Sequence, residues 1–229
     1  MLITMITFKR PDGKDCYGFY DGPKAGNSAP AVVVIQEWWG VNEQIKGVAQ
    51  KFASEGYRAL VPDLYRGQVG LDAKEAEHLM TNLNFGDAAS QDIAGAVRYL
   101  KQTGSKAGVT GFCMGGALTI LSAVFVPDSD ANVSWYGCPP LEYVDATKIK
   151  APLMGHWALD DAYFPVQQID GLEKKLQDAN VKYEGHRYNA KHAFANETNK
   201  DQSAPIAYNA SAAQTAWTRT LAFFKQHLG

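Results

Sequence analysis

The sequence predicts an α/β fold in which a mostly parallel central sheet carries helices on both faces. Short apolar runs rich in β-branched residues, of which residues 31–36 are the clearest, are typical of strands that are buried on both faces. Between these runs, apolar residues recur three or four positions apart, as they do in amphipathic helices. Strands that alternate with helices favour a parallel sheet, and 229 residues suffice for one such domain, which we expect to span residues 1–229.

The expected elements follow one another from residue 31. Strands are expected at 31–36, 58–61, 106–110, 131–136, 152–156 and 181–188. Helices are expected between 41 and 56, around 73–83, around 93–100, over 114–124, around 172–179 and over 210–228. The polar stretch from 65 to 90 holds three glycines and is expected to be loop apart from its short helix. In such sheets ligands bind beyond the carboxyl ends of the strands, so we look for candidate site residues there.

Composition and charge exclude several functions. The net charge of −2, with acids and bases mixed along the chain, predicts no binding of nucleic acid or of an anionic membrane. No apolar run approaches membrane-spanning length, and residues 1–10 are too polar for a signal peptide. The three cysteines form no CxxC pair, so we expect no disulfide framework, no structural zinc and a reducing, cytoplasmic location. We expect no cofactor or metal, a small-molecule partner, and a monomer or small homo-oligomer.

Cys113 occupies the serine position of a G-x-S-x-G pattern, between Gly111 and Gly115. A nucleophile on a sharp strand-to-helix turn has a strained backbone, and small residues two positions away prevent clashes. The required context is present, because an expected strand precedes the motif and an expected helix follows it. The N-terminus of that helix also favours a thiolate. The alternative is that Cys113 is a small buried apolar residue, as we expect for Cys16 and Cys138.

Proteins with this kind of elbow present their catalytic residues in the order nucleophile, acid, histidine. His192 follows the last expected strand and comes after both the elbow and a strand-end acid. Asp160 and Asp161 both follow the strand at 152–156, and we expect at least one of them to cap a helix before Pro165. An acid in this position fixes the imidazole tautomer, and the imidazole sets the ionisation of the thiol. The other histidines, expected to be structural or solvated, are His78, His156, His186 and His227.

Five short motifs are spread along the chain. They are QEWWG at 36–40, PDLY at 62–65, GFCMGG at 111–116, DAYFP at 161–165 and HAF at 192–194. Together they resemble the dienelactone hydrolase (carboxymethylenebutenolidase) family, over essentially the whole chain from Val32 to about Leu228. The cysteine elbow combined with the Gln-Glu-x-x-Gly strand end is specific among hydrolases. The resemblance implies an α/β-hydrolase fold.

The resemblance also implies roles for site residues. Cys113 would be the nucleophile, His192 the base and Asp161 the acid, because the family's acid precedes two variable residues, an apolar residue and proline. In this family a glutamate at the position of Glu37 lies against the nucleophile and helps control its thiol–thiolate state. The expected oxyanion-hole donors are two backbone N–H groups, those of Trp38 and Met114.

One departure from the family concerns substrate binding. The family's founding enzymes hold the substrate carboxylate with two arginines, and this chain has Asn196 at one of those positions. The other falls near Lys74, with His78 in place of a nearby tyrosine. A neutral amide and an ammonium do not reproduce the bidentate grip of a guanidinium. These three residues and Trp39 are the substrate-binding candidates, for a substrate other than dienelactone.

The sequence therefore predicts a carboxylic ester or lactone hydrolase that cleaves a small ester or enol lactone through a thioester on Cys113. A thiolate suits substrates whose own leaving group is good, such as an enolate. Two other classes stay open: a non-catalytic or sensor protein on the same fold, and a DJ-1-like or amidotransferase-like cysteine protein. Proteins of the last kind usually carry a histidine close behind the cysteine, where this chain has Met114. A redox role is a further alternative for a reactive thiol.

Overall fold

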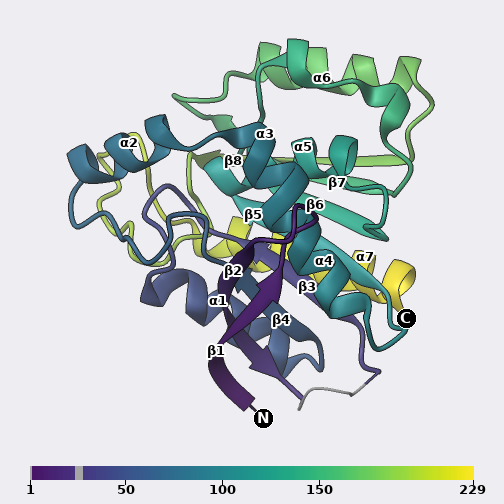
Figure 1. Cartoon of the computed structure of the whole chain (residues 1–229). Coiled ribbons are helices and arrows are strands. Elements are labelled where there is room, and N and C mark those ends of the chain that lie inside the picture. The colour runs from purple at the N-terminus through teal and green to yellow at the C-terminus, as the bar shows by residue number, and fades with distance from the viewer. Residues whose placement is uncertain (1, 24–27) are drawn as a thin grey trace.

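One eight-stranded sheet organises residues 2–23 and 28–229, the part of the chain that the computed structural model describes (Figure 1). The strands are β1 (Leu2–Lys9), β2 (Asp15–Gly22), β3 (Ala31–Ile35), β4 (Arg58–Pro62), β5 (Ala107–Phe112), β6 (Ala131–Trp135), β7 (Leu153–Asp160) and β8 (Tyr183–Lys191). They lie in the order β1-β2-β4-β3-β5-β6-β7-β8. The pairs β1–β2 and β2–β4 are antiparallel, and the other neighbours are parallel. The prediction of a mostly parallel sheet is confirmed.

Helices cover both faces of this sheet, as predicted. They are α1 (Glu43–Ser54), α2 (Ala73–Asn82), α3 (Phe85–Asp87), α4 (Ala94–Lys101), α5 (Met114–Phe125), α6 (Val166–Asp178) and α7 (Ala210–Leu228), with a π-helical turn η1 (Ala88–Ile93) and two 3-10 turns, η2 (Leu141–Tyr143) and η3 (Ala146–Lys148). Alternate side chains of a strand point to opposite faces. In β3, Val32 and Val34 therefore join the cluster with α1 and α7, whereas Val33 and Ile35 join the cluster with α4 and α5.

The hairpin β1–β2 is absent from the elements expected from the sequence. Its first strand does not form a continuous apolar run, because exposed Met5 and Thr7 alternate with less exposed side chains up to the buried Phe8. Such alternation is typical of a strand with one solvated face, and it is a weaker signal than the continuous apolar runs of the buried strands. The helix expected around 93–100 also begins earlier, since α3, η1 and α4 continue one another from Phe85 to Lys101.

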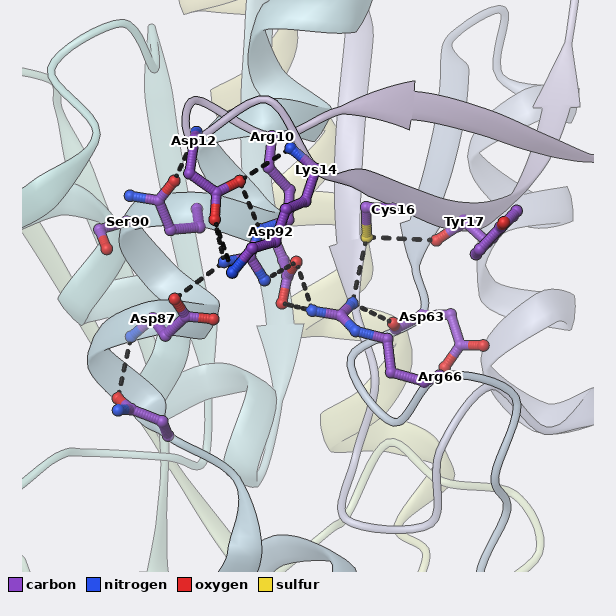
Figure 2. A network of polar contacts seen from close by, with 12 residues as sticks. Arg10, Asp12, Lys14, Cys16, Tyr17, Asp63, Arg66, Asp87, Ser90 and Asp92 are labelled. Atoms are coloured by element: carbon purple, nitrogen blue, oxygen red, sulfur yellow. Dashed lines mark hydrogen bonds and ion pairs between the residues drawn. The ribbon is translucent and has the colours of Figure 1, made fainter.

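An ionic cluster centred on two buried side chains, Arg10 and Asp92, joins this hairpin to the helices on one face of the sheet (Figure 2). We call it the arginine cluster, and it comprises Arg10, Asp12, Arg66, Asp87 and Asp92. Asp92 in η1 is only 1% exposed; its Oδ1 accepts hydrogen bonds from Arg10 Nη1 at 3.1 Å and from Arg66 Nη2 at 2.9 Å. Arg10 also pairs with Asp12 and Asp87. Because Asp87 ends α3, the cluster ties α3 and η1 to the turn after β1.

No helix within residues 2–23 and 28–229 combines the length and apolar character needed to cross a bilayer.

The parallel strands bring four loops to one edge of the sheet. The loops after β3, β5, β7 and β8 all leave from the carboxyl ends of strands that point the same way. These loops carry, in that order, Glu37, Cys113, Asp161 and His192. Topology alone therefore gathers the four candidate catalytic residues on one side of the molecule.

Candidate active site

Cys113 lies on a sharp turn between β5 and α5. Its backbone has φ 55° and ψ −118°, a conformation that residues other than glycine adopt rarely. A Cβ atom on Gly111 would collide with the carbonyl of Gly115, and one on Gly115 would lie 2.5 Å from the carbonyl oxygen of Gln36. A Cβ on Gly137, after β6, would collide with the carbonyl of Cys113 itself. The turn therefore needs glycine at all three positions, one more than the sequence motif indicates.

His192 connects Cys113 to Asp161. The imidazole Nε2 lies 3.1 Å from Cys113 Sγ, and Nδ1 lies 2.9 Å from Asp161 Oδ2. The other oxygen of Asp161 accepts the backbone N–H groups of Tyr163 at 2.8 Å and Phe164 at 2.9 Å. Burial lowers the pKa of His192, but the hydrogen bonds to Asp161 and Cys113 outweigh it and raise that pKa to about 10. The partners at both ring nitrogens therefore favour the protonated form of His192.

The two neighbouring aspartates have different positions. Asp161 points at His192, whereas Asp160 is exposed at the end of β7. The expectation that one of them caps α6 is wrong, because the N-cap residue of that helix is Pro165. Asp161 instead closes the turn that leads to Phe164, which fixes its carboxylate for the imidazole.

Glu37 lies two residues after the end of β3, and its side chain is buried, with only 4% of the residue exposed. Its Oε2 accepts a hydrogen bond from Asn196 Nδ2 at 2.8 Å, and its Oε1 has no hydrogen-bond partner among the described residues. Burial raises the pKa of Glu37, and the Asn196 amide, the charge of His192 and the hydroxyl of Tyr136 only partly offset that rise. Glu37 and Cys113 line the same cavity.

Tyr136 is a site residue that the sequence analysis missed. It follows β6 with φ 39°, and its ring packs edge-on against His192 at 5.3 Å between ring centroids. Burial, together with the charges of Glu37 and Cys113, raises the pKa of its hydroxyl well above the ordinary value. The signal was its place at the carboxyl end of an expected strand, immediately before Gly137.

The two residues expected to supply the oxyanion hole line the same cavity as Cys113. Met114 is the first residue of α5, so its backbone N–H has no partner inside that helix. Trp38 lies in the loop after β3, and both residues line the cavity that holds Cys113. The buried hydroxyl of Tyr65 donates a hydrogen bond to Met114 Sδ at 3.2 Å and so helps to fix this end of α5.

A cavity of about 920 Å³ opens in front of Cys113. Its wall is mostly apolar and aromatic, with side chains from the loop after β3, from α2 and α3, and from α5. Of the four substrate-binding candidates only Trp39 lies on this wall. Lys74 and His78 are exposed on α2, and Asn196 is 3% exposed and bonded to Glu37. The carboxamide of Asn196 is therefore committed to a carboxyl of the protein itself.

The second buried histidine differs from His192. His156, in the middle of β7, has one ring nitrogen 2.9 Å from Tyr188 Oη and the other 2.9 Å from Thr220 Oγ1. Burial lowers its pKa well below the ordinary value, so it is a neutral group that joins β7 to β8 and α7. Within the described residues no group of three or more His, Cys, Asp or Glu side chains is arranged to hold a metal ion.

Comparison with known proteins gives results consistent with this geometry. The model of the dienelactone hydrolase family matches residues 17–228. Protein usf of Aquifex pyrophilus is 35% identical over 235 residues, which cover 98% of either chain. A dienelactone hydrolase-like promiscuous phosphotriesterase from metagenomic libraries superposes with a TM-score of 0.85 at 24% identity, covering 100% of both chains. An esterase of Pyrococcus furiosus superposes with a TM-score of 0.70 at 16% identity, over 100% of this chain and 94% of that one. At these last two identities the likeness concerns the fold.

Proposed function

Because the chain belongs to the dienelactone hydrolase family, we propose that it hydrolyses a carboxylic ester or lactone with Cys113 as nucleophile. One observation carries the proposal: the imidazole of His192 lies 3.1 Å from the sulfur of Cys113 and 2.9 Å from the carboxylate of Asp161. A nucleophile, a base within hydrogen-bonding reach and a group that orients the base are the three parts that acyl transfer requires.

The first half of the reaction forms a thioester. The Cys113 thiolate adds to the carbonyl carbon, and the developing oxyanion accepts hydrogen bonds from the backbone N–H groups of Trp38 and Met114. The C–O bond to the leaving group then breaks, and the imidazolium of His192 gives its proton to the departing oxygen. Asp161 stabilises the imidazolium before that transfer.

The second half releases Cys113 from the thioester. His192, now neutral, takes a proton from water as the water adds to the thioester carbonyl. The C–S bond breaks, the acid product leaves, and the imidazolium–thiolate pair is restored. Glu37, whose pKa burial raises, is proposed to adjust the charge beside Cys113. Three free cysteines and a thiolate mechanism fit a reducing compartment such as the cytoplasm.

The proposal includes no substrate contact for Lys74, His78 or Asn196, since none of them lines the cavity. It keeps Trp39, which lines the cavity and packs edge-on against Trp38 at 5.1 Å between ring centroids. Without the family's arginines, dienelactone itself is not the proposed substrate.

The experiment is ester hydrolysis by the purified protein and by Cys113→Ala. We expect wild type to turn over p-nitrophenyl acetate and Cys113→Ala to lose at least about 10³-fold in kcat/KM while unfolding at an unchanged temperature. Mass spectrometry during turnover should show an acyl group on Cys113. Cys16→Ala, at a buried cysteine outside the cavity, is the matched control and should keep its activity. Full activity of Cys113→Ala would refute the mechanism, and an inert wild type would favour the sensor alternative.

A further inference from the structure

One wall of the cavity is a row of apolar side chains along α5. Ala117, Leu121 and Phe125 all line the cavity and are spaced four residues apart, so they form one row along the helix. At a rise of 1.5 Å per residue, the row from Ala117 to Phe125 is about 12 Å long. It begins one turn after Cys113 and ends at Phe125, which is 44% exposed. An apolar track therefore leads from the sulfur to the surface.

The facing wall of the cavity is apolar as well. It includes Met80 of α2, Phe85 of α3, Leu83 from the link between them, and the aromatic pair after β3. Exposed aromatic side chains, Tyr143 at 62% and Tyr163 at 56%, stand at the rim. The arginine cluster holds this wall in place through Asp87, two residues after Phe85 (Figure 2). The wall is thus built to contact an apolar group along its length.

The charges of the cavity oppose an anionic ligand. No lysine or arginine is among the described residues that line it, and its two acidic residues are the buried Glu37 and the exposed Glu77. Both ring nitrogens of His192 are already bonded, one to Asp161 and the other to Cys113. A substrate carboxylate would leave water without gaining a cation, which is costly in an apolar site.

We infer that the substrate is an uncharged ester or lactone that carries an extended apolar chain, which lies along the Ala117–Leu121–Phe125 row of α5. The inference rests on the proposed function and adds the substrate class to it. Buried apolar area is the main source of affinity for such a chain, so specificity should rise with chain length until the chain reaches the rim.

The test compares p-nitrophenyl esters of lengthening acyl chains, and in parallel alkyl acetates of lengthening alcohols, on wild-type protein. In one of the two series kcat/KM should rise by about tenfold or more from two to six or eight carbons. The p-nitrophenyl monoester of adipic acid, which matches the hexanoate in length but ends in a carboxylate, should be about 100-fold poorer than the hexanoate. Flat profiles in both series, or equal rates for the adipate and the hexanoate, would overturn the inference.

A substitution at the far end of the row tests where the apolar chain of the substrate lies. Phe125→Ser should lower kcat/KM for the preferred long substrate by about fivefold to tenfold and leave the acetate rate within about twofold, because only a long chain reaches that residue. Met5→Ser removes a comparably exposed apolar side chain on β1, 54% exposed and away from the cavity, and should change neither rate. Equal losses on short and long substrates would contradict the placement. Turnover of the acetate reports on the proposed function, so failure of that function is recognised separately.

Discussion

The cavity and the arginine cluster each bury one carboxyl group, and they surround it in opposite ways. Asp92 is 1% exposed and meets two guanidinium groups, with Arg66 Nη2 within 3.0 Å of both its oxygens (Figure 2). Glu37 is 4% exposed, meets one neutral amide and keeps an oxygen without a hydrogen bond among the described residues. Burial raises the pKa of both groups. Two guanidinium groups that hydrogen-bond Asp92 oppose this rise, whereas the charge of His192 opposes it at Glu37 without a hydrogen bond between the two.

Asp92 therefore stabilises the fold as a fixed charge, whereas Glu37 can take part in the chemistry of the site. A buried ion pair whose hydrogen bonds are satisfied has one stable protonation state, and removing either partner leaves the other uncompensated. A buried carboxyl with an unused oxygen has no partner that fixes its charged form, so its protonation can respond to the charge on a neighbouring nucleophile. Replacing either carboxyl by its isosteric amide should therefore give opposite results.

The largest effect is expected at the arginine cluster. Asp92→Asn keeps the shape of the side chain but leaves Arg10 and Arg66 facing a neutral amide in a buried position. We expect the free energy of unfolding to fall by about 3 kcal/mol. Urea unfolding followed by circular dichroism measures this. Since Asp92 does not line the cavity, kcat/KM at a temperature where the variant is folded should stay close to that of wild type.

Asp87→Asn is the matched control within the same cluster. Its carboxylate is 44% exposed and contacts Arg10 at 2.9 Å, so solvent screens the pair and the loss should stay below about 1 kcal/mol. Equal losses for the two variants would mean that burial does not distinguish these charges.

An effect of intermediate size is expected at Glu37. In Glu37→Gln the new carboxamide oxygen can still accept the hydrogen bond from Asn196, but no charge can form beside Cys113. We expect kcat/KM to fall by about tenfold, equivalent to about 1.4 kcal/mol in the barrier. The pH dependence of Cys113 alkylation by iodoacetamide should lose the component that Glu37 contributes. Glu43→Gln changes an exposed residue of α1 whose carboxylate pairs with Lys46, and it should leave both measurements unchanged.

The stability difference between Glu37→Gln and wild type should grow as the pH rises. Because the pKa of Glu37 is raised above its ordinary 4.5, the folded protein holds this proton more tightly than the unfolded chain. The stability contributed by Glu37 is thus complete below pH 4.5 and declines as the pH rises through the raised pKa. Glu37→Gln should match wild type in its free energy of unfolding near pH 4.5 and exceed it at pH 8. A variant less stable than wild type at pH 8 would place Glu37 with Asp92 as a structural charge.

Local patterns account for what the sequence predicted. The glycines around Cys113 and the strand ends before Asp161 and His192 are features of a few neighbouring residues. The order of strands in a parallel sheet then brings these ends to one edge, so the candidate site could be assembled without knowing any side-chain contact.

Long-range pairs account for what it did not predict. Asn196 donates to Glu37 across 159 positions of the chain, and Arg10 donates to Asp92 across 82. No periodicity or motif signals either pair. The family resemblance made Asn196 a substrate-binding candidate, whereas the structure turns its amide to a buried carboxyl. Tyr136 was missed for the same reason, since its importance comes from packing against His192.

The smallest effect is expected where the arginine cluster meets solvent. The side chain of Arg66 is 43% exposed, whereas that of Arg10 is 6% exposed. Arg66 also donates to the carbonyl of Asp63 at 3.1 Å, and a lysine ammonium at that position could reach Asp92 without keeping the fork that spans both groups. Arg66→Lys should therefore lower the free energy of unfolding by less than about 1 kcal/mol, because water and the retained charge compensate. Arg10→Lys should cost more, since its guanidinium is buried among three carboxylates. Urea unfolding of both variants measures these losses. Equal losses would mean that the arginines stabilise the fold through their charge alone, whatever their burial.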